Sequence, residues 1–343
     1  MSATLETAYL APGATAYVHD AVDVATARPA QSHERYERLI ARAKAVAALP
    51  TAVVWPCEEH ALTGAIEAGH EGIIKPILVG PEKTIRAVAE AAGLDLAGAE
   101  IIDAATEEAA ATVAVAQVAA GHAYCLMKGS LHTDVLMHAV VAKESGLRTS
   151  RRISHVYAVD VPSYPDVLFV TDMAINMFPD LDCKHDIVQN AIDLHVGLGL
   201  GAPRVAILSA VEVVNSRIPG TVDAACLCKM ADRGQITGGV LDGPLALDNA
   251  INLEAAAIKK IASPVAGRAQ ILVAPDLEAG NMLAKSLVFL AGGDAAGIVL
   301  GAKVPVILTS RADSVLTRMA STAIGALYAQ HLVEERRKTG GAA

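Results

Sequence analysis

Short runs of β-branched residues alternate with longer Ala-rich amphipathic segments along almost the whole chain. The first strands are expected at Thr51–Trp55 and Pro76–Val79, with helices at Glu58–Ala68 and from Pro81 to a stop at Gly93. Strands that alternate with helices of this length are joined by right-handed crossovers, which set the strands parallel and cover both faces of the sheet with helices. We therefore predict an α/β fold that is doubly wound, with mostly parallel sheets.

The same rhythm continues to the C-terminus. Further strands are expected at Glu100–Asp103, Ala123–Met127, Ile153–Val161, Val167–Thr171, Arg204–Leu208, Gly239–Leu241, Ile271–Ala274, Gly297–Leu300 and Val304–Thr309. Further helices are expected at Glu107–Ala120, Asp134–Ser145, Lys184–Leu198, Val222–Arg233, Asn249–Ile261, Ala279–Leu290 and Val315–Glu335. Hydrophobic residues make up 53% of the chain and aromatic residues 3%, so Ala, Val, Leu and Ile must fill the core of such sheets.

The length of 343 residues fits two α/β domains that share a cleft. One boundary is expected near Thr149, in a turn crowded with arginines, and a second near Gly292-Gly293. The prediction is a first domain of residues 1–150 plus 293–343 and a second domain of residues 151–292. Residues 1–31 are weakly patterned and are expected to form a loose extension.

Charge and cysteine content exclude several classes of protein. The net charge of −9 argues against nucleic acid and anionic membranes as partners. The chain begins without a signal-peptide pattern and contains no run of about 18 apolar residues, so a cytoplasmic protein is expected. The five cysteines follow neither a disulfide nor a zinc pattern and are expected to be buried, reduced side chains.

The glycine-rich segment His195–Gly201 has part of the spacing of a dinucleotide-binding fingerprint. That fingerprint requires its glycines after a strand and before a helix, where the helix N-terminus meets the pyrophosphate. Here the glycines follow a predicted helix and precede a predicted strand. The segment is therefore interpreted as a helix stop and not as a nicotinamide site.

Polar residues follow six of the predicted strands. They are Lys128–Asp134, Thr171-Asp172 with Asn176, Ser209–Glu212, Asp242–Pro244 with Asp248, Pro275-Asp276 with Gly280-Asn281, and Thr309–Ser314. Ligands of doubly wound sheets gather beyond the carboxyl ends of the strands. Taken in register, these six ends predict an active cleft.

The segment Thr309–Ser314 is the strongest candidate for an anion site. A strand end that leads into a helix offers free backbone N–H groups and the positive end of the helix dipole. Arg311 adds a guanidinium that grips phosphate through two hydrogen bonds, and Ser310 can donate to an oxyanion. The alternative is that Ser310 and Asp313 cap the final helix while Arg311 pairs with a surface acid.

Lys128-Gly129-Ser130 forms a second cationic strand end, where the glycine permits close approach of a ligand; an exposed lysine and an ordinary loop glycine are the alternative. His132 is either a ligand or proton carrier or, as we favour, a structural histidine. Thr133 and Asp134 are explained as the start of the next helix. The acids that follow other strands are candidates for a divalent cation site, although helix capping explains them more simply: Asp172, Asp242, Asp248 and Asp276.

Seven segments, in this order, resemble the phosphate acetyl/butyryltransferases. They are Leu126–Gly129 (LMKG), Arg151–His155 (RRISH), Thr171–Asn176 (TDMAIN), Gly220–Ala224 (GTVDA), Asp242–Asp248 (DGPLALD), Pro275–Asn281 (PDLEAGN) and Thr309–Ser314 (TSRADS). The resemblance implies two α/β domains of isocitrate/isopropylmalate dehydrogenase type with the active cleft between them, and a homodimer. It also implies the reversible reaction of acyl-CoA with phosphate to give acyl phosphate and CoA, with CoA as substrate and no bound prosthetic group.

The resemblance places Ser310 and Arg311 in the active site, with two departures from the acetyltransferase pattern. Thr317 stands where those enzymes carry a catalytic aspartate, and the nearby acid is Asp313; Met137 and His138 stand where they carry an arginine, whose charge Lys128 can supply. Both departures are typical of the butyryltransferase branch. The expected site residues, with no metal ligand among them, are catalytic Ser310, Arg311 and Asp313 and substrate-binding Lys128, Gly129, Ser130, His132, Thr133, Asp172, Asn176, Asp276 and Asn281.

The predicted activity is phosphate acetyltransfer, by direct attack of the CoA thiolate in a ternary complex. Phosphate butyryltransfer is the first alternative. Two rivals come from other classes: a metal- and NAD-dependent decarboxylating dehydrogenase, which would use the aspartates to bind a cation, and a CoA-binding sensor without activity, suggested by Thr317. The expected partners are acyl-CoA, phosphate and acyl phosphate.

Overall fold

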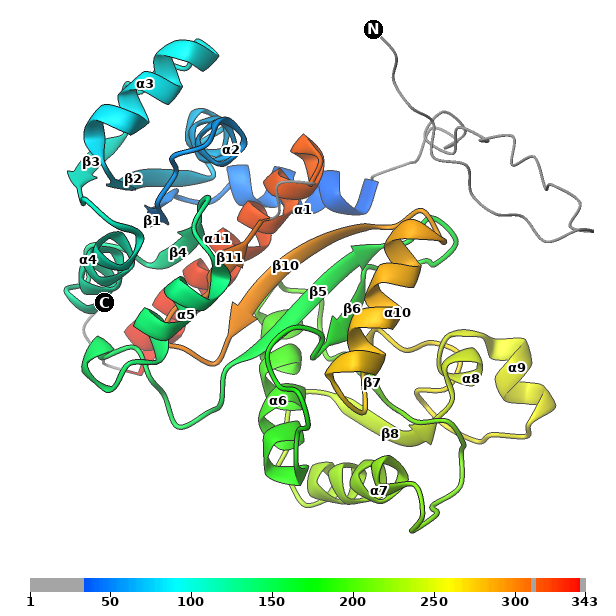
Figure 1. The fold of residues 1–343 in the computed structure, drawn as a ribbon. Helices are drawn as coiled ribbons and strands as arrows, with labels where there is room; N and C mark the ends of the chain where they lie inside the picture. Colours follow the sequence, from blue (N-terminus) through cyan, green and yellow to red (C-terminus); the bar gives the residue numbers. More distant parts are fainter. Residues whose placement is uncertain (1–33, 310–312, 340–343) are drawn as a thin grey trace, which may run out of the picture. The chain divides into compact units, whose positions relative to one another are not determined.

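The computed structural model describes residues 34–309 and 313–339, which form one sheet with helices on both faces (Figure 1). The strand order is β3-β2-β1-β4-β11-β10-β5-β6-β9-β7-β8. The strands are β1 Leu49–Val54, β2 Ile74–Gly80, β3 Glu100–Asp103, β4 Cys125–Lys128, β5 Ser154–Asp160, β6 Leu168–Thr171, β7 Arg204–Leu208, β8 Val240–Leu245, β9 Ile271–Val273, β10 Asp294–Leu300 and β11 Val306–Leu308.

The helices mostly occupy the segments between the strands, as the alternating pattern predicts. They are α1 Glu34–Lys44, α2 Glu59–His70, α3 Glu82–Ala92, α4 Glu107–Ala119, α5 Thr133–Val141, the 3₁₀ turn η2 Lys143–Ser145, α6 Leu181–Gly197, α7 Pro219–Asp232, α8 Leu247–Ile251, α9 Leu253–Ile258, α10 Leu277–Phe289 and α11 Val315–Lys338. None of the described helices is long and apolar enough to cross a membrane.

Strand direction reverses in the middle of the sheet. Strands β1 to β4 and β11 run parallel to one another, and β6 to β9 run parallel to one another. Between these two groups, β10 is antiparallel to both β11 and β5, and β5 is antiparallel to β6. The connections β5–β6 and β10–β11 are too short for a crossover helix, so each folds back directly. The carboxyl ends of the two parallel groups therefore lie at opposite edges, and the expectation that all six polar strand ends share one edge is wrong.

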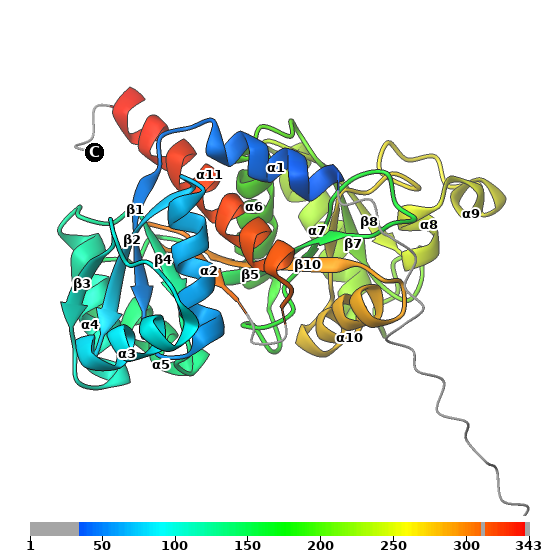
Figure 2. The ribbon, with the colours of Figure 1, turned by 90° about the horizontal axis from the view of Figure 1, so that it is seen from above.

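Three hydrophobic clusters pack the helices against this sheet. One contains α1, α6 and α11 side chains, such as Tyr36, Ile187 and Ile324. A second joins α4 and α5 to the β1–β4 half, and the third joins α8 and α10 to the β6–β9 half. Helix α11 lies along α1 and on β10, as the two views of Figures 1 and 2 show. The long C-terminal helix thus spans the junction between the two groups of strands.

Some local features differ from the sequence prediction, and two of them have a clear cause. The expected helix Asn249–Ile261 is two short helices, because Asn252 ends α8 and then caps α9, where its side-chain oxygen accepts a hydrogen bond from the Ala255 N–H. Helix α1 has no counterpart among the expected elements. Its side chains Tyr36, Leu39 and Ala43 are buried at helical spacing, a pattern the charged residues between them obscure.

Candidate active site

A small pocket lies where β1, β4 and β11 end and α11 begins. It is lined by Lys128, Gly129 and Ser130 after β4, by Thr309 after β11, and by Arg318 of α11, together with Glu58, His60 and Ala61 at the start of α2. The Thr309 hydroxyl donates a hydrogen bond to the Lys128 carbonyl over 3.3 Å. The two cationic strand ends expected from the sequence therefore lie side by side.

Local packing explains the residue types after β4. The Ser130 hydroxyl donates to the Trp55 carbonyl (2.8 Å) and accepts from the Cys57 N–H (3.2 Å). The Gly129 N–H donates to the Val54 carbonyl (2.8 Å), and a Cβ at Gly129 would overlap that oxygen and the Trp55 backbone. Glycine is thus required here by the neighbouring strand. The half-buried Lys128 side chain donates to the Gly129 carbonyl (3.2 Å) and, like Arg318, brings a cationic group to the pocket lining.

The beginning of α11 brings further polar groups to this edge. Ser314 caps the helix, and its hydroxyl oxygen accepts from the Thr317 N–H (3.1 Å). The Thr317 hydroxyl donates to a carboxylate oxygen of Asp294, at the start of β10, over 3.3 Å. A carboxylate therefore stands beside Thr317, supplied by a strand distant in sequence. The sequence prediction missed both Asp294 and Arg318.

Arg318 is 92% buried although it carries a full charge. Its Nη1 donates to the Asp313 carbonyl (2.5 Å), and its Nε is buried with no hydrogen-bond partner among the described residues. Gly64 of α2 makes room for it, because a Cβ there would lie 3.3 Å from Arg318 Cδ and 3.4 Å from Nε. A glycine inside a helix costs about 1 kcal/mol relative to alanine, so this close approach lowers the stability of α2.

The predicted catalytic residues Ser310 and Arg311 lie outside the described residues. The residues on either side of them are placed: Thr309 is bonded to Lys128, and Asp313 is half-buried beside Arg318. Burial raises the pKa of Tyr157 on β5, and the nearby Asp313 carboxylate raises it further. The Asp313 carboxylate is therefore near β5, at the edge where β11 ends.

Four other predicted binding residues gather at the carboxyl ends of β6 and β9, where they bind the backbone of their own loops. Asp172 accepts hydrogen bonds from the N–H groups of Ala174 (2.9 Å), Ile175 (3.1 Å) and Asn176 (3.2 Å), and from the Asn176 side chain (2.6 Å). The Asn176 amide also donates to the Ile153 carbonyl (2.9 Å). This set of bonds fixes the turn after β6.

The remaining two residues of this cluster tie α10 to the same turn. Asp276 caps α10 by accepting from the Ala279 N–H (2.9 Å), and the Asn281 amide donates to the Met173 carbonyl (3.3 Å). Gly280 allows the close contact, because a Cβ there would overlap the Asp172 carbonyl. The four side chains thus fix the turn after β6 and the start of α10.

His155 and Tyr157 of β5 connect the two regions. Their rings meet edge to face with centroids 4.9 Å apart. Burial lowers the pKa of His155 to about 4, opposed by the Asp172 carboxylate, and its Nδ1 is buried with no hydrogen-bond partner among the described residues. Because Tyr157 interacts with Asp313 and His155 with Asp172, a short series of ionisable groups runs along β5 from one region to the other.

The last two predicted binding residues are at the start of α5. His132 and Thr133 are exposed, and the His132 side chain makes no capping hydrogen bond. The His132 N–H donates to a Glu107 carboxylate oxygen over 3.4 Å. Neither side chain lines the pocket beside Lys128.

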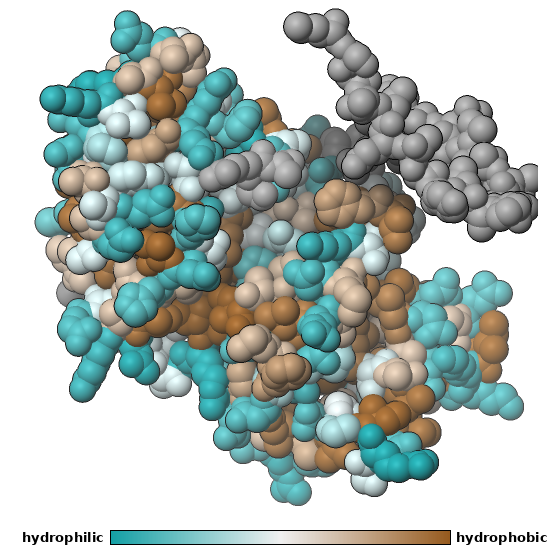
Figure 3. All heavy atoms as spheres, viewed as in Figure 1, coloured by the Kyte–Doolittle hydropathy of each residue, from teal (hydrophilic) through white to brown (hydrophobic). Residues whose placement is uncertain are grey.

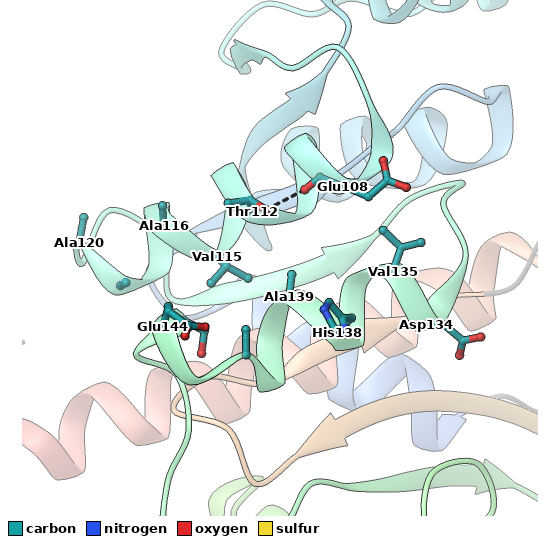
Figure 4. Close-up of a pocket in the computed structure, with 13 residues that line it drawn as sticks. Glu108, Thr112, Val115, Ala116, Ala120, Asp134, Val135, His138, Ala139 and Glu144 are labelled. Carbon is teal, nitrogen blue, oxygen red and sulfur yellow. Dashed lines mark hydrogen bonds between the residues drawn. The ribbon is translucent and has the colours of Figure 1, made fainter.

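A larger cavity of about 920 Å³ lies between α4 and α5 (Figure 4). Its walls are mostly alanine and valine, and its polar side chains include the acids Glu108, Asp134 and Glu144. Three carboxylates against one imidazole, His138, disfavour an anionic ligand. This cavity does not have the chemistry of a phosphate or CoA site.

Two further observations concern possible metal ligands and the thiol beside the pocket. Among residues 34–309 and 313–339, no three His, Cys, Asp or Glu side chains are grouped closely enough to hold a metal ion. Burial, and to a smaller extent the nearby acids Glu107 and Glu58, raises the pKa of Cys57, beside Ser130, to about 11. This thiol is protonated at neutral pH and is a poor nucleophile.

The geometry defines an α/β protein with a cationic pocket at the strand ends β4 and β11. The family model "Phosphate acetyl/butaryl transferase" matches residues 106–326. A phosphate acetyltransferase of Rhizobium meliloti is 65% identical over 301 residues, which are 88% of this chain and 95% of that protein. A phosphate butyryltransferase of Clostridium beijerinckii is 42% identical over 86% of this chain and 98% of its own length.

The fold comparison points to the same group. The crystal structure of a branched-chain phosphotransacylase from Enterococcus faecalis V583 is 30% identical and superposes with a TM-score of 0.72, covering 82% of this chain and 99% of that one. The chain therefore belongs to the phosphate acetyl/butaryl transferase family. This confirms the resemblance seen in the sequence and the α/β fold with a mostly parallel sheet.

Proposed function

We propose that this protein is a phosphate acyltransferase that interconverts acetyl-CoA plus phosphate with acetyl phosphate plus CoA. The observation that carries the proposal is the 65% identity to a phosphate acetyltransferase over most of both chains. The cationic pocket supports it, because Lys128 and Arg318 lie beside Thr309, the residue directly before Ser310-Arg311. Butyryl transfer is the alternative acyl specificity, supported by the butyryltransferase relative and by Thr317.

The mechanism we propose is direct transfer without a covalent enzyme intermediate. In one direction the CoA thiolate attacks the acyl phosphate carbonyl, a C–S bond forms, and the C–O bond to phosphate breaks with its electron pair leaving on the phosphate oxygen. Arg311 and Lys128 hold the phosphoryl oxygens, and Ser310 with nearby N–H groups stabilises the oxyanion. The protonated Cys57 thiol favours this route over acylation of that cysteine.

Proton removal from the CoA thiol is a smaller part of the barrier. We assign it to Asp313, which is half-buried beside the pocket residue Arg318. A thiol pKa of about 8.5 makes deprotonation near pH 7 cost only ~2 kcal/mol, and a general base typically contributes ~10²–10⁴-fold. Correct positioning of two anionic substrates can contribute ~7–11 kcal/mol.

These roles predict which of two variants loses more activity. Arg311→Ala is expected to lose more activity than Asp313→Ala, because the arginine positions and neutralises phosphate while the acid only assists proton transfer. Release of free thiol from acetyl-CoA, measured with and without phosphate at fixed pH, gives both rates. A larger loss in Asp313→Ala would reverse the assignment, and a wild-type chain without phosphate-dependent thiol release would refute the proposed function.

Acyl chain length requires a separate measurement. Initial rates with acetyl-, propionyl- and butyryl-CoA at saturating phosphate compare the two branches of the family directly. The highest kcat/KM for acetyl-CoA is the expected result. A preference for butyryl-CoA would assign the chain to the butyryltransferase branch and leave the reaction type unchanged.

We further infer two α/β domains, residues 1–150 with 293–343 and residues 151–292, of isocitrate/isopropylmalate dehydrogenase type, with the active cleft between them. The return of β10 and β11 to the side of β4 supports this division. We also infer a homodimer. Large apolar side chains that reach the surface support it, among them Phe178 (85% exposed) and Leu290 (85% exposed), and Figure 3 shows apolar surface in several places on the face drawn there.

A further inference from the structure

We infer that Arg318 is a further phosphate-binding residue, which acts beside Lys128 on the tetrahedral phosphoryl group. This inference rests on the proposed function for the identity of the substrate. It assigns a role to a side chain that lies in the second turn of α11, beyond the Thr309–Ser314 segment. The geometry of the pocket, the burial of the guanidinium and its incomplete hydrogen bonding support this role.

Burial of the charged Arg318 side chain costs free energy. Arginine is almost never fully buried unless its charge is matched, since a buried ionised group without adequate partners is strongly unfavourable. Arg318 is 92% buried, and the contact that its guanidinium makes with the described backbone is one carbonyl, that of Asp313. A carbonyl supplies a partial charge only. An anionic ligand would supply the rest.

One hydrogen-bond donor of this guanidinium lacks a partner. Nε of Arg318 is buried and has no hydrogen-bond partner among residues 34–309 and 313–339. Such groups are rare in folded proteins, and one that lines a pocket is a candidate ligand contact. Nε and an adjacent Nη together form the planar pair of donors that grips two oxygens of one phosphate.

The residues around the guanidinium suit an anionic ligand. Lys128, Ser130 and Thr309 line the same pocket, so a second cation and two hydroxyl-bearing residues converge with Arg318. Glu58 is the one carboxylate among the described residues that line it. The lining therefore carries a net positive charge in a protein whose overall charge is −9. That local excess fits a small dianion such as inorganic phosphate.

Side chains that line the pocket must move before it can hold a phosphate ion. It measures about 20 Å³, room for a single water molecule and not for a phosphate. Lys128 and Glu58 are only half-buried, and His60 is exposed, so rotation of these side chains is the simplest way to admit the anion. Arg318, held against Gly64 and bonded to Asp313, is the fixed part of the site.

In the reaction, Arg318 would stabilise the negative charge that collects on phosphate as the C–O bond breaks. It neither gives nor takes a proton, because the arginine side chain stays protonated in proteins. In the reverse direction the same contact would orient phosphate for attack on the thioester carbonyl, with the electron pair leaving on sulfur. The residue touches the leaving or attacking group and not the acyl chain, so its loss should affect phosphate selectively.

The test uses the purified full-length chain and three variants: Arg318→Met, Arg318→Lys and, as a control, Arg337→Met, which removes an exposed charge from the same helix. The rate of thiol release is measured against inorganic phosphate and, separately, against acetyl-CoA. In Arg318→Met we expect the KM for phosphate to rise at least about tenfold, the effect of losing one charge-assisted hydrogen bond, with the KM for acetyl-CoA changed by less than about threefold. Arg318→Lys should fall between Arg318→Met and the wild type.

A second readout separates binding from a structural role. Guanidinium ion at millimolar concentration should restore part of the lost rate in Arg318→Met and have no such effect on Arg337→Met. Equal increases in both KM values without rescue, or an unchanged KM for phosphate in a folded variant, would overturn the assignment. If Arg318→Met does not fold, the phosphate KM of Arg318→Lys decides in the same way.

A measurement of phosphate binding tests the role of Arg318 separately from the proposed function. Inorganic phosphate should raise the Tm of the wild-type chain and of Arg337→Met, and should raise that of the Arg318 variants much less at the same concentration. A wild-type chain that lacks activity yet is stabilised by phosphate through Arg318 would refute the proposed function alone. Equal stabilisation of all variants would refute the role of Arg318 alone.

Discussion

The two groups of strand ends carry the same kinds of residue and use them differently. At the ends of β4 and β11, Lys128 and Arg318 line a pocket, and Nε of Arg318 has no hydrogen-bond partner among the described residues. After β6 and β9, Asp172 and Asn176 bind the backbone of their own turn. A polar residue after a strand is therefore evidence for a ligand site only when the turn that positions it does not already occupy its hydrogen bonds.

The largest effect that this comparison predicts is on activity at the β4 end. Lys128→Met should lower kcat/KM for phosphate by ~10²–10³, the range found when one preorganised electrostatic group is removed from a site. The Tm should change little, because the Lys128 side chain is only half-buried and donates to the carbonyl of its chain neighbour Gly129. Steady-state kinetics and a thermal scan measure the two quantities.

Two controls accompany this variant. Lys128→Arg should keep most of the activity, and Lys285→Met, which removes an exposed charge from α10, should keep all of it. Full activity in Lys128→Met would show that the two regions do not differ in the way described.

The next effect is on stability at the β6 end. Asp172→Ala removes the acceptor of three backbone N–H groups and of the Asn176 amide in a buried turn. Hydrogen bonds to a charged acceptor contribute about 1.5–3 kcal/mol each at most, and their loss is shared with water, so we expect the free energy of unfolding to fall by roughly 3 kcal/mol. Denaturant unfolding measures the change.

Activity is measured as well, at a low temperature where the wild type and the Asp172 variants are all folded. Asp172→Asn, which keeps the shape and one of the two acceptor oxygens, should lie between wild type and Asp172→Ala in stability. A variant of unchanged stability with greatly reduced kcat would assign Asp172 a direct role with substrate.

The smallest effect concerns His155, between the two regions. An imidazole in an unfolded chain titrates near 6.5, whereas burial lowers the pKa of His155 to about 4. Between these two pH values the unfolded state binds a proton that the native state does not, so stability falls as the pH is lowered from about 6.5 to 4. From pH 7 to pH 5 this single group should remove about 2 kcal/mol.

His155→Phe should remove that contribution and flatten the dependence of unfolding free energy on pH. His122→Phe, at an exposed position on the same chain, serves as the matched control and should leave the dependence as it is in wild type. An identical slope in His155→Phe and wild type would show that the imidazole is not the titrating group.

Much of the fold follows from periodicity, because each buried strand and amphipathic helix carries its own local pattern. Strands β3 and β7 lie at the expected residues, and α11 begins at Val315 as predicted. Pairing direction was harder to predict. The antiparallel pairs β5–β6 and β10–β11 depend on connections that are too short for a helix, a signal that was present in the expected strand boundaries but masked by the alternating pattern elsewhere.

The candidate site was predictable in part for the same reason. Lys128 and Thr309 each follow a strand, and their adjacency follows from the pairing of β4 with β11. Arg318 and Asp294 were missed because neither lies directly after a strand. Arg318 lies among the first residues of a helix, and Asp294 begins a strand, so only tertiary packing brings Arg318 to the pocket and Asp294 to Thr317.

The reversal of strand direction also bears on how this molecule moves. Hydrogen bonds run without interruption from β3 to β8, through the antiparallel ladder of β10 and β5. Any opening of one half relative to the other must therefore bend or twist this ladder while its bonds persist, since rupture would expose a row of unpaired amides. The amide protons of β5 and β10 should consequently be among the slowest to exchange with solvent, even while substrates come and go.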